Sequence, residues 1–455
     1  MKTFKLLTVF IIFSVVLIVT TNAMAEKGTE FLLEDPCEFF EPPANGTDTE
    51  MLCGVHQGAG YRIEVPVNWN GDLLMWAHGY RMNNEWLWVD DPPFREWLVA
   101  NGYAWAASSF TTSKLDVTDG MKATKALVAL FEESVGIPAH IYISGQSMGG
   151  AVTVSSIEQW PDLYDGGMPT CGSLTLYAGF DTYLDFYVLS NALAGTTATY
   201  PIPEDYASAG YPSVVNHLAG APGYFPYLLN SQGIQLKDAF ELRTGGQRPV
   251  FDQAFVFWYG IAEIAYGFSL TQFFIDLEPI GVKGVWVDNQ DTIYQFDTDP
   301  DLSADEISLN ESVLRIQRDP QSLHSNGLKN VPYNDGKIKV PVLSLHNLGD
   351  LLVPFSAEQI YAQRVAEQGA SELLVQRAIR DLQHCYFTED EYATAFSDLV
   401  NWVESGIKPA GDDLLNPVVV SEPDFGCAFT SEDRDPRIGT SRPVDSDPKC
   451  QRDFS

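Results

Sequence analysis

The stretch that decides the fold covers residues 140–150 and reads HIYISGQSMGG. A short run of β-forming residues ends in a Gly-x-Ser-x-Gly motif, and a helix-compatible segment follows at residues 151–159. This order predicts a strand, a sharp turn and a helix, with Ser147 strained at the turn and its hydroxyl exposed. Gly145 and Gly149 fit the turn because a side chain at either position would collide with the crossing strand or helix. The stretch therefore predicts a nucleophilic serine.

Apolar runs that alternate with helical segments surround this motif on both sides. Strands are expected at residues 61–67, 72–77, 103–108, 174–179, 342–345 and about 373–379, and helices at residues 94–101, 118–134, 356–368 and 389–404. Thr118 or Asp119 is expected to cap the second of these helices. Strands and helices that alternate at this interval predict an α/β fold, with a mostly parallel sheet flanked by helices on both faces.

The alternation is interrupted by a long segment that is rich in aromatic side chains. This segment is too long for a loop and too apolar for a disordered linker, so we expect a large, mainly helical cap inserted into the core. Within it, residues 285–287 and 292–294 are expected to form a hairpin. The expected parts are residues 26–60 as an N-terminal extension, 61–179 and 336–410 as the core, 180–335 as the cap, and 411–455 as a surface-hugging C-terminal tail.

The first residues have the features of an export signal. Lys2 and Lys5 precede an almost wholly apolar run at residues 6–19, and residues 23–25 (AMA) match a cleavage site. The apolar run is shorter than the ~20 residues that a membrane-spanning helix needs. We therefore expect residues 1–25 to be a cleaved signal peptide and the protein to be secreted or periplasmic, without insertion into a membrane.

The cysteines are interpreted in the light of export. The chain has 6 cysteines, and an even number in an oxidising compartment indicates disulfides. The sequence permits many connectivities. The pairing that we favour joins Cys37 to Cys53, Cys427 to Cys450 and, by remainder, Cys171 to Cys385. Neither a CxxC pair nor an HExxH motif is present, and we expect no metal and no other cofactor.

The formal net charge of −34 at pH 7 argues against partners that are themselves polyanions. Nucleic acid and anionic membrane surfaces would be repelled by such a chain. The 61 carboxylates are spread along the whole sequence, which is typical of a solvated surface that maintains solubility. The partner that we expect is a small-molecule substrate.

A serine hydroxyl attacks efficiently only when a base takes its proton, and two further residues complete the expected set. Asp350 follows the strand expected at residues 342–345, and His384 follows the strand that ends near residue 379. Both therefore occupy the loops that carry the acid and the base when the chain order is Ser, Asp, His. We expect His384 to accept the Ser147 proton and Asp350 to fix the imidazole tautomer.

Other histidines and aspartates fit these roles less well. His140 lies on the strand that leads to the nucleophile, and His346 is expected to pack under the acid loop. The remaining histidines lie outside the sheet alternation: His56, His217 and His324. Asp381 is expected to be a turn residue. Asp181 is the main rival acid, because it follows the strand expected to end at residue 179.

The developing oxyanion of an acyl transfer needs hydrogen-bond donors, each worth about 2.7–4 kcal/mol of barrier in known cases. The backbone N–H of Met148, directly after the nucleophile, is one expected donor. The other should come from the loop after the strand at residues 72–77, which carries His78-Gly79-Tyr80. Gly79 lets the backbone turn toward the site, and the N–H of Tyr80 is the second donor that we predict.

Together, these residues resemble the α/β-hydrolase superfamily. The matching positions, in the order of that superfamily, are His78-Gly79, residues 145–149, Asp350 and His384. The resemblance covers residues 61–179 and 336–405 and implies an α/β-hydrolase fold, with the cap at the superfamily's common insertion site.

Three stretches look like exported bacterial esterases of the feruloyl-esterase and tannase kind: residues 61–80, residues 106–109 and the pair His384-Cys385. Members with a paired-cysteine active site carry a cysteine just before the serine, which bonds the cysteine after the histidine. Residue 146 is a glutamine here. A disulfide that directly joins the nucleophile and base loops is therefore excluded.

The sequence thus predicts an exported serine carboxylic ester hydrolase that acts through an acyl-Ser147 intermediate. The aromatic cap favours an ester with an aromatic or bulky moiety, because caps form the apolar wall of such pockets. The alternative is an exported serine aminopeptidase of the proline-releasing type, which shares the fold and the triad. It would need an acidic cluster in the cap, for which Glu204, Asp205 and Glu263 are candidates. A catalytically idle binding protein is a third hypothesis, which the complete set of site residues disfavours.

Overall fold

The computed structural model describes residues 31–38, 40–82, 84–262, 269–276, 284–322 and 330–431. The expected signal peptide, His324, Glu263, Cys450 and the tail beyond residue 431 lie outside these ranges. Within the described residues, no helix combines the length and the apolarity that crossing a bilayer requires.

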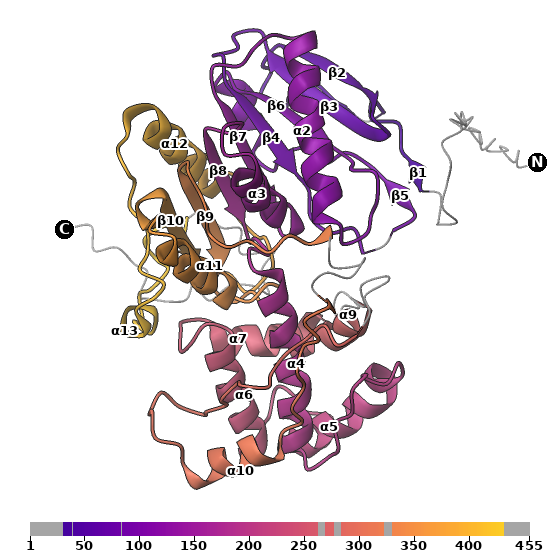
Figure 1. The fold of residues 1–455 in the computed structure, drawn as a ribbon, viewed down its shortest axis with the longest axis vertical. Coiled ribbons are helices and arrows are strands. Elements are labelled where there is room, and N and C mark those ends of the chain that lie inside the picture. The colour runs from indigo at the N-terminus through magenta and orange to yellow at the C-terminus, as the bar shows by residue number, and fades with distance from the viewer. Residues whose placement is uncertain are drawn as a thin grey trace, which may run out of the picture. The chain divides into compact units, whose positions relative to one another are not determined.

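A central sheet organises the described chain (Figure 1). Its strands are β2 (Thr49–His56), β3 (Ala59–Pro66), β4 (Leu73–Ala77), β6 (Ala104–Ser108), β7 (Ile141–Gln146), β8 (Gly166–Thr170), β9 (Val342–Asn347) and β10 (Leu374–Ile379). The sheet has 8 strands in the order β10-β9-β8-β7-β4-β6-β3-β2. All neighbours from β10 to β6 are parallel, and only the β6–β3 and β3–β2 pairs are antiparallel. The expectation of a mostly parallel sheet is confirmed.

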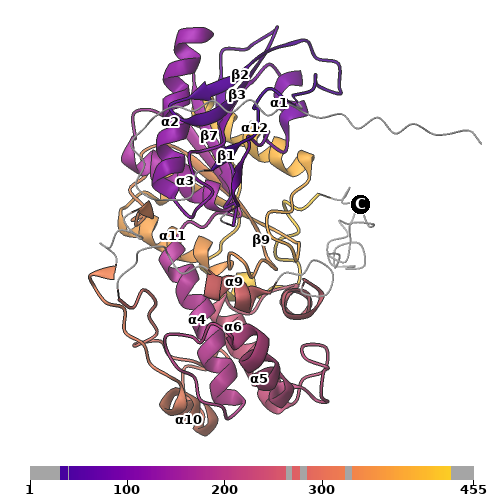
Figure 2. The same cartoon turned by 90° about the vertical axis from the view of Figure 1, so that its right-hand side faces the viewer.

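Helices cover both faces of this sheet (Figure 2). They are α1 (Arg95–Ala100), α2 (Val117–Ser134), α3 (Met148–Gln159), α11 (Ser356–Glu367) and α12 (Glu389–Ser405). Successive strand side chains point to opposite faces. Leu74 and Trp76 of β4 therefore pack in the cluster that contains α1 and α12. Leu73 and Met75 pack instead with α2, α3 and α11. Each face thus has its own apolar core.

Helix α2 begins at Val117, before both of its expected caps. Asp116 is the N-cap residue, and its side chain accepts a hydrogen bond of 2.8 Å from the Asp119 N–H. Both of the expected caps, Thr118 and Asp119, lie inside the helix. Both expected caps are therefore wrong, and the capping side chain is that of Asp116.

The strand expected at residues 174–179 is wrong. The sheet instead continues through β8, whose sequence is GGMPT, and Leu176 begins the long helix α4 (Leu176–Leu193). The glycines of β8 have a packing reason. A Cβ on Gly167 would lie 2.2 Å from Ile157 Cδ1, so helix α3 packs directly against bare backbone.

The segment expected as an irregular N-terminal extension also contributes to the sheet. Residues 49–56 form β2, which pairs antiparallel with β3 along its full length. The short strands β1 (Leu32–Leu33) and β5 (Trp86–Leu87) pair separately. A disulfide between Cys37 and Cys53, one of the pairings that we favoured, ties the start of the described chain to β2.

The segment between α4 and β9 is mainly helical. Besides α4 it contains η1 (Tyr206–Gly210), α5 (Tyr211–Leu218), α6 (Ser231–Arg243), α7 (Phe251–Val256), η2 (Phe257–Ile261), α9 (Leu270–Asp276) and α10 (Ala304–Ser312). Most of its aromatic rings pack on one another, as in the stacked pair Phe186 and Tyr259 with ring centroids 4.0 Å apart. We call residues 180–335 the cap.

The hairpin expected at residues 285–287 and 292–294 is absent, because neither stretch is a strand. The buried side chain of Asn289 holds this region instead. Its Oδ1 accepts from the Ile316 N–H at 2.7 Å, and its Nδ2 donates to Leu314 O at 2.9 Å. These side-chain bonds add to a backbone bond between the same segments, from the Asn289 N–H to Ile316 O at 2.9 Å.

The described part of the tail packs on the sheet edge. Asp412 N–H donates to Gln376 O of β10 at 2.8 Å, and α13 (Pro417–Val420) follows. Arg380, which is fully buried, donates to the carbonyl oxygens of Phe425 and Pro423. Residues 411–431 therefore cover β10 and the loop that follows it.

Candidate active site

Ser147 lies at the turn between β7 and α3. Its φ of 59° and ψ of −118° place it in a conformation that only a constrained turn maintains. A Cβ on Gly145 would lie 2.5 Å from Ala77 O, and one on Gly149 would lie 2.0 Å from the same atom. The two glycines are therefore required by the close approach of β4, as the motif predicted.

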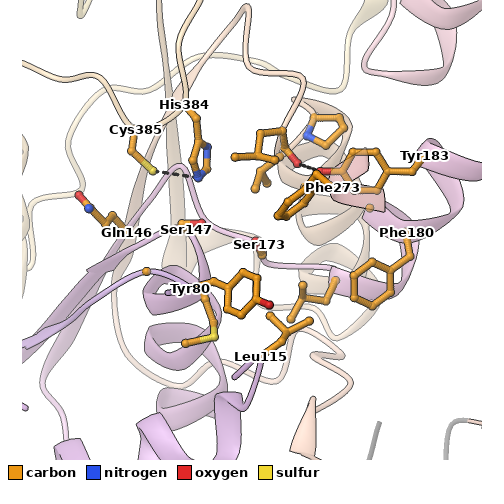
Figure 3. Close-up of a pocket in the computed structure, with 18 of the residues that line it drawn as sticks. Tyr80, Leu115, Gln146, Ser147, Ser173, Phe180, Tyr183, Phe273, His384 and Cys385 are labelled. Atoms are coloured by element: carbon orange, nitrogen blue, oxygen red, sulfur yellow. Dashed lines mark hydrogen bonds between the residues drawn. The ribbon is translucent and has the colours of Figure 1, made fainter. Parts of the chain in front are cut away.

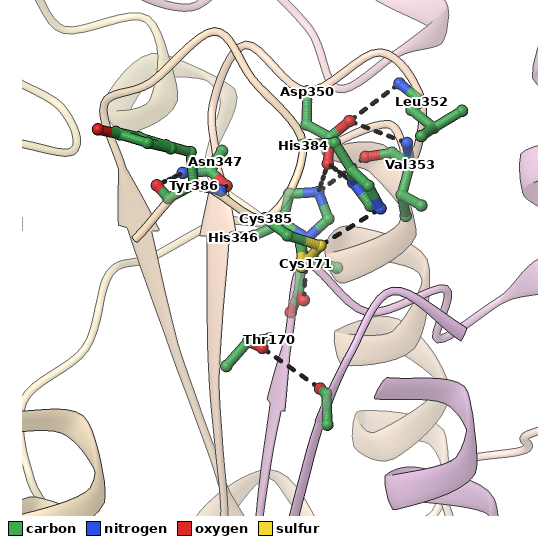
Figure 4. Close-up of a disulfide and its surroundings, with 12 residues drawn as sticks. Thr170, Cys171, His346, Asn347, Asp350, Leu352, Val353, His384, Cys385 and Tyr386 are labelled. Atoms are coloured by element: carbon green, nitrogen blue, oxygen red, sulfur yellow. Dashed lines mark hydrogen bonds and ion pairs between the residues drawn. A yellow bond between two sulfur atoms is a disulfide. The ribbon is translucent and has the colours of Figure 1, made fainter. Parts of the chain in front are cut away.

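Asp350 and His384 meet at the carboxyl ends of β9 and β10 (Figure 4). His384 Nδ1 lies 2.5 Å from Asp350 Oδ2. The other oxygen, Oδ1, accepts from the N–H groups of Leu352 at 2.9 Å and Val353 at 3.0 Å. Asp350 is fully buried, and its Oδ2 is the acceptor that faces His384 Nδ1. The proton of the neutral imidazole is thus held on Nδ1, which leaves Nε2 available as a base.

His384 and Ser147 line the same cavity, and Figure 3 shows the imidazole directed toward the serine. Within the described residues, no hydrogen bond joins Ser147 Oγ to His384 Nε2. Nε2 lies 3.3 Å from Cys385 Sγ. Contacts of this kind commonly tighten only when substrate is bound. The structure therefore brings the three expected residues together, but the hydrogen bond between Ser147 and His384 is not formed.

The rival acids are engaged elsewhere. Asp181 pairs with Arg318 in the cap and accepts from the Asp288 N–H, and burial raises its pKa to about 6. It does not line the cavity of Ser147. Asp381 accepts from the Gln383 N–H at 2.8 Å, which is a turn contact.

His346 is buried beneath the acid loop. Its Nε2 donates to Val353 O at 2.8 Å and lies 4.0 Å from Asp350 Oδ2, while Nδ1 lies 3.3 Å from Glu358 Oε1. Burial alone would lower the pKa of His346, but Glu358, then Asp350 and the Val353 carbonyl, hold it above its usual value. His346 therefore supports the loop that presents Asp350, and it does not face the serine.

The loop that carries Tyr80, the expected second oxyanion donor, is held by contacts of His78 and Arg81. His78 Nδ1 lies 2.6 Å from Gly79 O and 3.2 Å from Arg81 Nε, and its Nε2 lies 3.1 Å from Ser109 O. Burial, then the charge of Arg81, lowers the pKa of His78 to about 3, and the ring stays neutral. Arg81 itself stacks over Trp88 at 3.5 Å and pairs with Asp90 at 2.9 Å.

Both expected oxyanion residues, Tyr80 and Met148, line the cavity. Gly79 packs against the nucleophile, since a Cβ there would lie 3.4 Å from Ser147 Cβ. The N–H of Met148 has no backbone acceptor among the described residues. The N-terminus of α3 thus points an available donor at the site, a position that stabilises negative charge.

A disulfide between Cys171 and Cys385 links the base loop to the end of β8 (Figure 4). The pairing is one that we favoured, but sequence reasoning did not foresee its place in the site. The Ser147 N–H donates to Thr170 O at 3.0 Å, so β8 is also bonded to the nucleophile turn. Although Gln146 excludes a direct bridge, the base loop is tied to the strand beside the nucleophile.

Trp258 of the cap joins the acid and base loops. Its indole Nε1–H donates to Gly349 O at 2.9 Å and to Leu382 O at 2.8 Å. These carbonyls precede Asp350 by one residue and His384 by two. Sequence analysis missed Trp258, because nothing distinguishes it from the many aromatic residues that pack within the cap.

The cavity beside Ser147 has a volume of about 290 Å³ and mostly apolar walls (Figure 3). Its large side chains are those of Tyr80, Leu115, Leu176, Phe180, Tyr183 and Phe273. Among the described residues of its lining, only His384 carries a side chain that can be charged at neutral pH. The walls therefore suit an aromatic or aliphatic group.

Among the described residues, two groups of side chains have the composition of metal ligands. Cys171, His384 and Cys385 form one, but both sulfurs are used by the disulfide. Asp72, His140 and Glu404 form the other, at the opposite ends of β4 and β7. In this second group, His140 Nδ1 lies 3.0 Å from Asp72 Oδ1, so these two side chains already pair with one another. Neither group places a metal at Ser147.

The sheet order, the strand–turn–helix at Ser147 and the loops after β9 and β10 define an α/β-hydrolase fold. No family model matches the chain. An o-phthalyl amidase of Xanthobacter agilis is 22% identical over 431 residues, which covers 81% of this chain and 91% of that protein.

Two solved structures are more distantly similar. Feruloyl esterase B from Aspergillus oryzae is 12% identical with a TM-score of 0.45, over 80% of this chain and 82% of that chain. The rice cell wall degrading esterase LipA from Xanthomonas oryzae is 14% identical with a TM-score of 0.38, over 75% and 86%.

Proposed function

We propose that the protein hydrolyses carboxylic esters through an acyl-Ser147 intermediate. The observation that carries this proposal is the 2.5 Å contact between Asp350 and His384, with His384 Nε2 facing the cavity that Ser147 lines. A neutral histidine with its proton held on Nδ1 is the base that a serine hydroxyl needs. The N–H groups of Met148 and Tyr80 are the proposed oxyanion donors.

The reaction proceeds in two halves. His384 Nε2 takes the proton of Ser147 as its Oγ attacks the ester carbonyl, and the same proton passes to the departing alcohol. Water then attacks the acyl-serine, with His384 again as base, and the free acid leaves. Asp350 stays ionised throughout and stabilises the imidazolium in both halves.

The cavity supports an aromatic or bulky moiety in the substrate. Phe180, Tyr183 and Phe273 form its far wall, and rings of this kind pack well against another ring. A volume of about 290 Å³ is close to the lower limit of small-molecule sites and matches a single substituted ring.

Amide hydrolysis is a second candidate, and the amidase from Xanthobacter agilis favours it. The same nucleophile and base would cleave an amide if the amine were protonated as it leaves. An aminopeptidase needs a carboxylate for the substrate's amino group, and Glu204 and Asp205 are exposed and outside the cavity lining. An arylamide series beside the matching aryl esters separates these activities.

We also propose that the protein acts after export, with residues 1–25 removed. The disulfides Cys37–Cys53 and Cys171–Cys385 support this, because such bonds persist in oxidising compartments. Sequencing of the N-terminus of protein recovered outside the cytoplasm tests it, with a start near Glu26 expected.

The direct test uses 4-nitrophenyl benzoate and 4-nitrophenyl butyrate with purified wild type, Ser147→Ala and Ser155→Ala. Ser155 lies within α3, away from the cavity, where its hydroxyl donates to Asn334. Turnover is expected from wild type and Ser155→Ala and not from Ser147→Ala. Equal rates in wild type and Ser147→Ala would discard the proposal.

A further inference from the structure

The N-terminus of α4 opens into the cavity of Ser147. Thr175 is the N-cap residue, yet its side chain makes no capping hydrogen bond, and both Thr175 and Leu176 line the cavity. The N–H groups of Leu176 and Ala178 have no backbone acceptor among the described residues. The helix is 18 residues long, so this end carries a substantial positive partial charge.

The hydroxyl of Ser173 is a second, independent feature of the same place. Ser173 is 9% exposed and lines the cavity between Ser147 and the aromatic wall (Figure 3). Its Oγ has no hydrogen-bond partner among the described residues. Buried hydroxyls are almost always paired. A hydroxyl that is nine-tenths buried and left open toward a substrate cavity is therefore available to the substrate.

Thr175 adds a further hydroxyl without a partner. The residue is 3% exposed, and its Oγ1 is buried without a hydrogen bond. Its hydroxyl would cost free energy if it remained unpaired. The Ser173 hydroxyl and the positive end of a helix thus lie on one wall, with the buried Thr175 hydroxyl beside them, while the other walls are mostly apolar.

The geometry points to a carboxylate subsite formed by Ser173, Thr175 and the first turn of α4. The inference rests on the proposed function and makes it more specific: the acyl group of the substrate carries a second carboxylate. The substrates are then half-esters or half-amides of a dicarboxylic acid, with the free carboxylate at the helix terminus. Helix N-termini with hydroxyl donors are common anion sites.

The position of the subsite limits the distance between the two carboxyl groups. The Ser173 N–H donates to Ser147 O at 3.0 Å, so the subsite adjoins the nucleophile. The second carboxylate must therefore be close to the scissile carbonyl, as in ortho or meta positions of one ring. The aromatic wall beyond it holds that ring.

The net charge of the chain opposes such a substrate. At −34, the protein repels anions in general. The overall charge of the protein therefore cannot produce a preference for an anionic acyl group. Such a preference has to come from the hydrogen-bond donors of the subsite.

The test compares 4-nitrophenyl esters of benzoic acid that carry a second carboxyl group, ortho or meta, either free or as its methyl ester. Spontaneous hydrolysis is measured separately and subtracted. For wild type, the free carboxylate is expected to raise kcat/KM about tenfold or more over the methyl ester at the better ring position. The readout is this ratio within each variant, which cancels general losses of activity.

The variants are Ser173→Ala, Ser173→Asp and Thr175→Val, with Ser208→Ala as the matched control. Ser208 is an exposed cap residue whose hydroxyl donates to Asp205 O. Ser173→Ala keeps the backbone bond to Ser147 and is expected to lower the ratio about fivefold, with Thr175→Val acting in the same direction. Ser173→Asp is expected to reverse the preference, and Ser208→Ala to retain it.

The outcomes separate the subsite from the proposed function. Turnover that depends on Ser147 but shows no preference for the free carboxylate discards the subsite alone. A preference that survives all three subsite variants also overturns this assignment. Hydrolysis of both ester types by Ser147→Ala discards the proposed function itself.

Discussion

At the scale of single residues, the site depends on how Asp350 is held. Both of its oxygens are used, one by His384 and one by the N–H groups of Leu352 and Val353. No water-exposed surface remains on this carboxylate. Its position is therefore determined before a substrate arrives, which is what an orienting group requires.

Asp350→Asn is expected to lower kcat about 10³–10⁴-fold with little change in fold, because an amide at this position favours the wrong imidazole tautomer. Asp181→Asn removes the rival carboxylate and is expected to keep kcat within about threefold, since Asp181 pairs with Arg318 in the cap. Steady-state kinetics on both variants check this. Loss of activity in Asp181→Asn alone would reverse the assignment of the acid.

At the residue level, the sequence predicts candidate site residues where chemistry and chain order act together. Ser147, Asp350 and His384 each follow a strand, and the order of those strands restricts the candidates to a few. Trp258 and Ser173 could not be found in this way. Their roles depend on which carbonyl or cavity the folded chain places beside them, and neither leaves a local pattern.

At the scale of elements, the disulfide Cys171–Cys385 positions the base loop on β8. The double variant Cys171→Ala/Cys385→Ala is expected to lower kcat/KM about tenfold or more, because a small displacement of His384 spoils the attack geometry. It should also lower the free energy of unfolding by about 2–5 kcal/mol. Kinetics and urea unfolding measure the two effects.

The matched control is the other described bridge, Cys37–Cys53, which lies at the start of the sheet. The double variant Cys37→Ala/Cys53→Ala is expected to lose stability but to retain kcat/KM below its unfolding transition. An equal loss of activity from both double variants would mean that the bridge at the site has no special role in positioning the histidine.

The tail gives a pH-dependent prediction. Burial raises the pKa of Asp412 to about 6, against partial compensation by the Ala378 N–H and Arg377. A raised pKa in the folded state means that this group stabilises the fold below about pH 4, the ordinary value, and that this contribution is lost as the pH rises through 6. An Asp412→Asn variant has no carboxyl group at this position, so its stability does not fall in this way as the pH rises.

The urea midpoint of Asp412→Asn relative to wild type is therefore expected to be higher at pH 7.5 than at pH 4. The comparison uses the difference between variant and wild type at each pH, so other titrating groups cancel. A difference that falls between pH 4 and pH 7.5 would contradict the buried position of this carboxylate.

Elements were predicted well where the apolar pattern was continuous and poorly where packing required glycine. The strands β4, β6, β7, β9 and β10 all lie within a residue or two of expectation. β8 was missed because its glycines and proline have low strand propensity, yet Gly167 is needed for contact with α3. The run at residues 174–179 alternates like a strand, but Leu176 starts a helix.

At the scale of the whole molecule, the net charge affects the stability of the fold. With 61 acidic and 27 basic side chains, the folded protein repels itself electrostatically. Salt screens this repulsion, with a screening length of about 10 Å at 0.1 M. The unfolding temperature is therefore expected to rise between 0.02 and 0.5 M NaCl at about pH 7.5; a fall, measured by calorimetry, would mean that attractive ion pairs dominate.

The cap does more than line the cavity, because it also contacts the loops that carry Asp350 and His384. Through Trp258 it is bonded to the loops of both Asp350 and His384, and through Tyr183 to Leu352 of the acid loop. Core and cap therefore share the site. The length and aromatic content of this segment were sufficient to predict a helical insertion, but its contacts with the catalytic loops follow only from the folded chain.

As the proposed nucleophile, Ser147 is expected to become acylated during turnover. Mass spectrometry of protein quenched with acid during hydrolysis of a 4-nitrophenyl ester tests it most directly. An acyl mass increment is expected on the peptide that contains Ser147 and is expected to be absent in Ser147→Ala. Turnover without any adduct on that peptide, together with an adduct on a different side chain, would contradict it.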